Sequence, residues 1–78
     1  MVTMTQRIYG AFVSNVRERM DDLGLSQKDL AAKLKVSPSY VSQMLSGHRR
    51  PGLDSLDEFA TALDTEPADL IRQPEKVS

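Results

Sequence analysis

Apolar side chains recur at every third or fourth position between residues 8 and 23, and the run stops at Gly24. On a helix this spacing places them along one stripe, and a glycine just after the last apolar residue is typical of a helix end. The stripe consists of Ile8, Phe12, Val13, Val16, Met20 and Leu23. No segment alternates apolar and polar residues for long enough to indicate a strand, so the pattern predicts an all-α fold.

Two shorter helices are predicted by their start signals. Ser26 precedes QKDLAAKL, and its hydroxyl can cap the backbone amide of Asp29. Ser37 and Pro38 open a third helix that stops at Gly47, because a proline is well tolerated at the first helical position. The expected inward faces of these two helices are Leu30, Ala31 and Leu34, and then Val41, Met44 and Leu45.

Two more helices complete the predicted domain. The segment LDSLDEFATALD predicts a fourth helix, whose expected buried stripe is Leu53, Leu56, Phe59, Ala60 and Leu63. Pro67 opens a short fifth helix over residues 67–73, which Pro74 ends. We therefore expect a single domain over residues 1–73 and a frayed tail over residues 74–78.

The composition excludes several classes of protein. The chain has no cysteine and one histidine, His48, which argues against a disulfide framework, a structural zinc site or any other metal site. No nucleophile and base occur together, so we expect neither an enzyme nor a cofactor. No apolar run is long enough to cross a membrane and the N-terminus lacks a secretory signal, so we expect a cytoplasmic protein without a membrane partner.

The net charge of −1 conceals an uneven distribution. Residues 1–50 carry eight basic and four acidic side chains, a net charge of +4, whereas residues 51–78 carry two basic and seven acidic ones, a net charge of −5. Such asymmetry indicates a positive face for a polyanion and a separate acidic region. Solvated helix faces with uneven charge explain the same numbers, and composition alone leaves both interpretations open.

The run SQKDLAAKLKVSPSYVSQMLSGHRRPGLDSLDEFATALDTEPADLI resembles the helix-turn-helix family of phage repressors and Xre-type bacterial regulators. The resemblance covers roughly residues 10–71. Its fixed positions are Gln27, Leu30, Ala31, Val36, Val41, Met44, Gly47, Arg49 and Pro51. It implies a compact five-helix, lambda-repressor-like DNA-binding domain whose helix-turn-helix core covers residues 26–46.

The same resemblance implies that the helix over residues 38–46 enters the major groove of double-stranded DNA. Polar side chains at its start would meet the edges of the bases. A glutamine can bond an adenine through two hydrogen bonds, serine can serve several bases, and a tyrosine ring can pack on a thymine methyl group. The expected base-reading residues are Ser39, Tyr40 and Gln43, with Ser37 and Ser42 in support. Pro38 stands where several phage repressors have a base-reading glutamine, so direct readout is expected to be sparser here.

Phosphate contacts are expected at two places. The resemblance places Ser26 and Gln27, at the start of the second helix, against one phosphate, where free amides and the helix dipole also favour an anion. The other group follows the third helix and consists of Ser46, His48, Arg49 and Arg50. An alternative for Arg49 is that it holds the loop in place through backbone carbonyls.

Two departures from the family pattern lead to structural expectations. Lys35 stands in a turn that often has glycine because its backbone is left-handed, at a cost of about 1 kcal/mol for a lysine. Some phage repressors bury an arginine of the first helix against a glutamate of the third, and the matching residues here are Met20 and Leu45. Since both are apolar, we expect them to touch in the core.

The leading functional hypothesis is a sequence-specific transcriptional regulator that binds a palindromic operator as a homodimer. No ligand-sensing domain is left over, so regulation is expected to follow protein concentration, as in phage repressors or the controller proteins of restriction-modification operons. The dimer contact is expected around the fifth helix and the N-terminus, at Leu70, Ile71, Ile8 and Tyr9, although each of these residues could instead belong to the core. The alternative hypothesis is an antitoxin-type protein that binds a protein partner, with the acidic C-terminal part available for such a partner.

Overall fold

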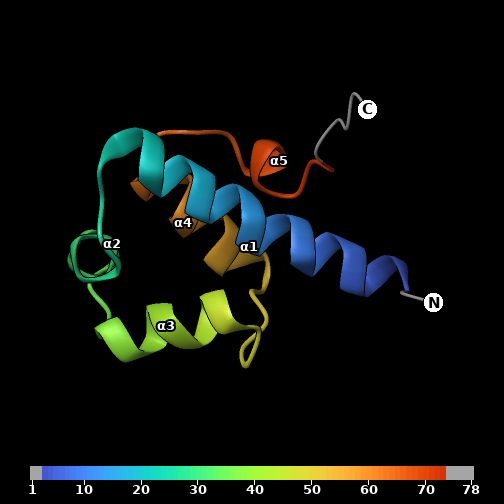
Figure 1. Ribbon diagram of the computed structural model, residues 1–78, viewed down its shortest axis with the longest axis horizontal. Coiled ribbons are helices and arrows are strands. Elements are labelled where there is room, and N and C mark those ends of the chain that lie inside the picture. Colours follow the sequence, from blue (N-terminus) through green and yellow to red (C-terminus); the bar gives the residue numbers. More distant parts are fainter. Residues whose placement is uncertain (1–2, 74–78) are drawn as a thin grey trace.

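The computed structural model describes residues 3–73, and within that range it contains five helices and no strand. They are α1 (Met4–Leu23), α2 (Gln27–Leu34), α3 (Pro38–Ser46), α4 (Leu53–Ala62) and α5 (Pro67–Leu70). The long helix α1 crosses the middle of the molecule and contacts α3 on one side and α5 on the other (Figure 1). The predicted all-α fold is confirmed. The predicted tail over residues 74–78 lies outside the described residues.

Three helices begin at a side-chain cap. The hydroxyl of Ser26 accepts a hydrogen bond from the amide of Asp29 at 3.0 Å, and the Asp29 carboxylate accepts one from the Ser26 amide at 3.1 Å. Thr3 and Gln6 form the same reciprocal arrangement in front of α1. This cap explains why α1 begins at Met4, one turn before the apolar stripe that predicts it. In front of α3, the Ser37 hydroxyl accepts from the amide of Tyr40 at 3.1 Å.

The first three helices end in a left-handed residue. Gly24 after α1 and Gly47 after α3 have φ angles of 67° and 85°, which glycine adopts without strain. The residue after α2 is Lys35, with a φ of 59°. The left-handed turn expected there is confirmed, and a lysine occupies it at a cost of about 1–2 kcal/mol.

The core forms where α1, α3 and α4 meet. Phe12 and Phe59 lie edge to face with their ring centroids 5.3 Å apart. Met20 and Leu45 belong to the same buried cluster and are 6% and 3% exposed. Both therefore lie in the core, as their predicted contact requires, and the contact itself stays a prediction. The rest of the buried cluster comprises Val16, Leu30, Ala31, Val41, Met44, Ala60, Leu63 and Leu70. No polar or charged residue in the described range is buried, so the helices are joined by apolar packing.

The structure corrects three details of the predicted helices. Leu53, expected in the buried stripe of the fourth helix, is 86% exposed, because it is the first residue of α4 and precedes the face that packs. Leu70, expected at a dimer contact, is 2% exposed and belongs to the monomer core, which was the alternative left open for it. The fifth helix ends at Leu70 instead of continuing to residue 73.

No helix in the described part of the chain has the length and apolar character needed to span a lipid bilayer.

Candidate nucleic-acid interface

Helix α3 divides its side chains between the core and the solvent. Val41, Met44 and Leu45 face inward and are at most 3% exposed. On its other side α3 exposes small or uncharged polar side chains, which are Ser39, Ser42, Gln43 and Ser46. The expected inward face is therefore confirmed, and three of the five expected base-reading residues lie together on the exposed side.

Tyr40 and Ser37 have contacts within the protein. Tyr40 is half-buried, and its hydroxyl lies 3.4 Å from the hydroxyl oxygen of Ser55 on α4. The Ser37 oxygen accepts the capping hydrogen bond at the start of α3. Both side chains therefore help to fix α3 on the body of the protein, in addition to any contact that they make outside it.

Arg49 connects the loop after α3 to the exposed face of the helix. Its Nε–H donates a hydrogen bond of 2.6 Å to Oε1 of Gln43, and its guanidinium lies 5.4 Å from the centre of the Tyr40 ring. The structure thus offers a third arrangement besides the two that the sequence suggests for Arg49. This side chain packs against two expected base-reading residues and makes no side-chain hydrogen bond to a backbone carbonyl in the described range.

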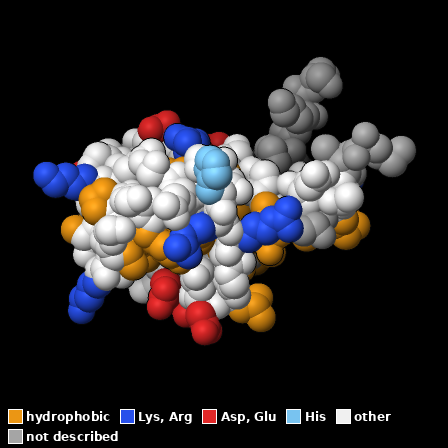
Figure 2. Space-filling view, turned by 90° about the horizontal axis from the view of Figure 1, so that it is seen from below, with side chains coloured by type: hydrophobic (Ala, Val, Ile, Leu, Met, Phe, Trp, Pro, Cys, Tyr) orange, Lys and Arg blue, Asp and Glu red, His pale blue; other side chains and the backbone are white. Residues whose placement is uncertain are grey.

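The other members of this loop lie close to the end of α3. The Ser46 hydroxyl lies 2.7 Å from Nδ1 of His48 and donates to the Gln43 carbonyl at 3.2 Å. The guanidinium of Arg50 lies 5.0 Å from the centre of the Tyr9 ring, which belongs to α1. All four expected phosphate-binding residues of this segment, from Ser46 to Arg50, are exposed. Figure 2 shows the molecule from the side of α3, with Lys and Arg side chains and the histidine spread over this face and acidic side chains toward its edges.

The other expected phosphate contact lies at the start of α2, apart from this loop. Ser26 is exposed and Gln27 is half-buried. Hydrogen bonds from the backbone and side chain of Ser26 lower the pKa of the Asp29 carboxyl, so this side chain is anionic at neutral pH. An anion approaching the first turn of α2 would therefore meet free amides beside a fixed negative charge.

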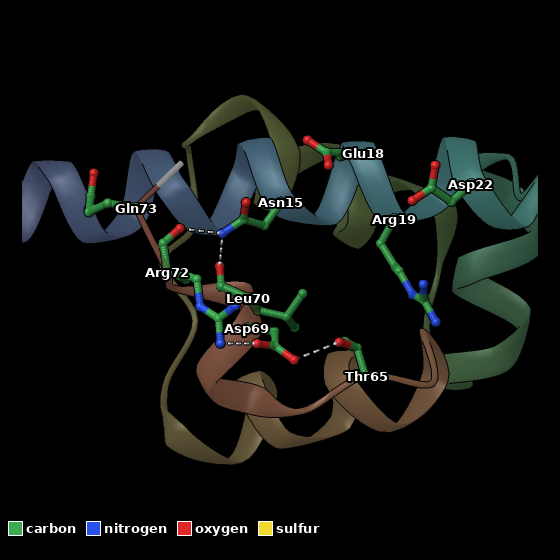
Figure 3. A pocket seen from close by; sticks show the side chains of 9 residues that line it. All are labelled: Asn15, Glu18, Arg19, Asp22, Thr65, Asp69, Leu70, Arg72 and Gln73. Atoms are coloured by element: carbon green, nitrogen blue, oxygen red, sulfur yellow. Dashed lines mark hydrogen bonds and ion pairs between the residues drawn. The ribbon is translucent and has the colours of Figure 1, made fainter. Parts of the chain in front are cut away.

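A hollow of about 850 Å³ lies between α1 and α5, and no residue of α3 lines it. Figure 3 shows that several of its polar groups pair with one another: Nδ2 of Asn15 donates to the carbonyls of Leu70 and Arg72, and Arg72 pairs with Asp69. Arg19 donates to the carbonyls of Leu63 and Asp64 at 2.8 and 2.9 Å, just after α4. These contacts close the ends of α4 and α5, so Asn15, Arg19 and Arg72 serve the fold. The described residues contain no group of His, Asp or Glu side chains suited to hold a metal ion.

This arrangement, in which a capped helix α2 is followed by a left-handed turn and a helix α3 with an exposed polar face, matches a known family. The family model described as helix-turn-helix matches residues 16–70. The chain belongs to the helix-turn-helix family.

Two proteins with similar sequences are named as regulators. The control protein C.BamHI of Bacillus amyloliquefaciens is 32% identical over 69 residues, which are 87% of this chain and 85% of that protein. An uncharacterized HTH-type transcriptional regulator of Archaeoglobus fulgidus is 53% identical over 38 residues, which are 49% of this chain and 17% of that protein.

Solved structures agree with this assignment. The restriction-modification controller protein C.AhdI from Aeromonas hydrophila is 35% identical, with a TM-score of 0.73 over 85% of this chain and 97% of that one. The hypothetical transcription factor NHTF from Neisseria, at 23% identity, has a TM-score of 0.84 over 95% of this chain and 85% of that one, which shows the shared fold. The protein is therefore a DNA-binding transcriptional regulator with the lambda-repressor-like fold, and its family is non-enzymatic.

Proposed function

We propose that this helix-turn-helix protein is a sequence-specific regulator that binds a palindromic operator in double-stranded DNA as a homodimer in the cytoplasm. The observation that carries the proposal is the exposed polar face of α3, bordered directly by Arg49 and Arg50. A helix inserted into the major groove needs polar side chains toward the base edges and cations beside the adjoining phosphates. Helix α3 and the loop after it supply both.

Base reading is assigned to the exposed side of α3. Ser39, Ser42 and Gln43 are free to meet base edges, and Gln43 keeps its amide nitrogen as a donor while its oxygen accepts from Arg49. Serine discriminates weakly between bases, whereas one good two-bond contact contributes about 1–3 kcal/mol of discrimination. Tyr40 and Ser37 lie at the N-terminal end of the same helix and support this set.

Anchoring to the DNA backbone is assigned to two groups of residues, one in the loop that follows α3 and one at the start of α2. The exposed Ser46, His48 and Arg50 would contact one strand, together with Arg49. Ser26 and Gln27 would contact a phosphate at the start of α2, through the hydroxyl, the amide and the backbone N–H groups. Contacts of this kind fix the register of the protein on DNA without reading the sequence.

Homodimer formation is assigned to apolar side chains near the N-terminus of α1. Ile8 and Ile71 are 38% and 36% exposed, and Leu53 is 86% exposed. Together with Tyr9 they line one hollow of about 360 Å³ between α1, α4 and the residue after α5. A two-fold axis through this surface would present two copies of α3 to DNA, with half-sites one turn, or about 34–36 Å, apart.

The similarity to the control protein C.BamHI and to the controller protein C.AhdI supports autoregulation through protein concentration.

The test is a gel-shift titration on DNA from upstream of the protein's own gene, with scrambled DNA of equal length for comparison. The wild type should prefer the upstream DNA and bind as a dimer in analytical ultracentrifugation. Gln43→Ala should lose about 1–3 kcal/mol of that preference, whereas Arg50→Ala should weaken both complexes alike. Equal binding of the folded wild type to both DNAs, there and at neighbouring promoters, would contradict the proposed operator function.

A further inference from the structure

A groove of about 530 Å³ runs between α1 and the end of α3, and three arginines line it. Arg49 and Arg50 come from the loop after α3 and already belong to the proposed interface. The third is Arg17, from the middle of α1, a helix to which neither the family resemblance nor the proposed function assigns a DNA contact. The fold thus places a cation of α1 in the same hollow as two cations of the loop.

The contacts of Arg17 leave most of its donors free. One Nη atom lies 3.5 Å from the carbonyl oxygen of Leu45, at the C-terminal end of α3, and the side chain is exposed. The guanidinium has five N–H donors, and this long contact uses one of them. A cation beside the last carbonyls of a helix is favoured by the helix dipole, which explains why Arg17 lies there in the absence of another partner.

No carboxylate neutralises this groove. Between residues 3 and 73 the single ion pair joins Arg72 to Asp69, and both of these residues line the other hollow. Met20 on α1 and Leu45 at the end of α3 are buried and apolar, where some phage repressors are expected to have an arginine and a glutamate. With no glutamate at the end of α3, the side chain of Arg17 has no anionic partner at the junction of α1 and α3.

Three uncompensated positive charges in one hollow repel one another, and an anion within the hollow removes that cost. We propose that Arg17 binds a phosphodiester of the DNA backbone, in the groove between α1 and the C-terminal end of α3. This site rests on the proposed function, since the phosphate is supplied by DNA held against α3. It extends the DNA contacts to α1 and gives each protomer one more cationic side chain that contacts the DNA backbone.

The competing explanation is that Arg17 only caps α3. Loss of a cap would lower the stability of the fold and leave the number of phosphate contacts unchanged. Loss of a phosphate contact would lower the affinity for any DNA and reduce the salt dependence of binding, with little effect on stability. The dependence of log K on log salt concentration therefore separates the two roles, because each neutralised phosphate contributes about 0.9 to the slope.

The experiment measures binding of wild type, Arg17→Ala and Arg17→Lys to operator and scrambled DNA between 50 and 200 mM salt, together with thermal unfolding. Arg17→Ala should bind both DNAs about tenfold more weakly and lower the slope by about 0.9 for each protomer bound. Arg17→Lys should keep most of the slope. Arg72→Ala is the matched control: it removes the same charge from a different groove and should leave the slope unchanged.

The outcomes separate the two proposals. If the wild type shows no specific binding, the proposed function itself is contradicted. If the wild type binds specifically and Arg17→Ala keeps its slope, the Arg17 site is overturned, whether or not the melting temperature falls. A slope reduced equally by Arg17→Ala and Arg72→Ala would also overturn it, because the effect would then follow net charge alone.

Discussion

Arg49 and Gln43 are joined by a hydrogen bond of 2.6 Å from Nε of the arginine to Oε1 of the glutamine. The bond spans the end of α3, where the left-handed Gly47 turns the chain back toward the helix. The same guanidinium lies over the ring of Tyr40, so the arginine holds two side chains of the proposed reading face at once. Oε1 of Gln43 is occupied on the side of Arg49, and its amide nitrogen remains free as a donor.

We predict that Arg49→Ala reduces the preference between operator and scrambled DNA as well as the affinity. Without the guanidinium, the Gln43 amide regains its rotational freedom and no longer presents a fixed donor. The expected loss of preference is about 1–3 kcal/mol, as for removal of a base contact. Fluorescence anisotropy titrations on the operator and on scrambled DNA measure it, with Arg50→Ala as the control. If Arg49→Ala weakens both complexes by the same factor, Arg49 is only a phosphate anchor.

Most of the fold was predictable because its signals are local. Ser26 and Ser37 followed by Pro38 begin helices through hydrogen bonds over three residues, and Gly24 and Gly47 end them through their own backbone angles. The errors in the predicted burial and helix bounds arise where a helical segment is too short, or a residue too close to its end, for the apolar spacing to define the buried face. Leu53 lies at the first position of α4, and α5 is a single turn, so the sequence could not tell which of their side chains would be buried.

The candidate site was predictable as a set of residues and less so as a geometry. The exposed polar face of α3 follows from helical spacing and from the family resemblance. The bond between Arg49 and Gln43 depends on the path of a loop and on two side-chain rotamers, which spacing does not define. Arg17 was missed because its partner groups come from the end of α3, 28 residues away in sequence.

Leu45→Glu is predicted to lower the free energy of unfolding by about 3–5 kcal/mol, because an unpaired charge would enter a core where Leu45 is 3% exposed. The double variant Met20→Arg with Leu45→Glu should recover part of this loss, since it supplies the opposite charge to the same cluster. Urea unfolding measures both, and Leu45→Met, which conserves volume, should cost less than about 1.5 kcal/mol. With the single variant Met20→Arg measured as well, simple addition of the two single effects in the double variant would show that these positions are not coupled.

Lys35→Gly is predicted to stabilise the fold. The lysine backbone has a φ of 59°, which costs about 1–2 kcal/mol, and glycine adopts the same angle without strain. Part of this gain is offset because glycine makes the unfolded chain more flexible, so the net effect should be on the order of 0.5–1 kcal/mol. Thermal unfolding of this variant should be compared with that of Lys33→Gly. Lys33 lies two residues earlier, inside α2, and its replacement by glycine should lower the stability by about 1 kcal/mol. A lower stability of Lys35→Gly would mean that the lysine side chain makes a compensating contact.

The cap of α2 should make stability depend on pH. Backbone and side-chain hydrogen bonds from Ser26 lower the pKa of Asp29 below its ordinary value of 3.8 in the folded protein. A group whose folded pKa is lowered stabilises the fold above its unfolded pKa, and this contribution is lost as the pH falls through the folded value. The stability difference between wild type and Asp29→Asn should therefore be largest near neutral pH and should shrink below pH 3.8.

Urea unfolding of both proteins between pH 7 and pH 2.5 measures this difference. Asp57→Asn is the matched control, because Asp57 is an exposed carboxyl inside α4 and accepts no side-chain hydrogen bond in the described range. Its substitution changes the net charge equally without touching a cap. The cap has no such role if the difference for Asp29→Asn stays constant with pH, or if it varies in the same way for Asp57→Asn, because general charge effects would then account for the whole change.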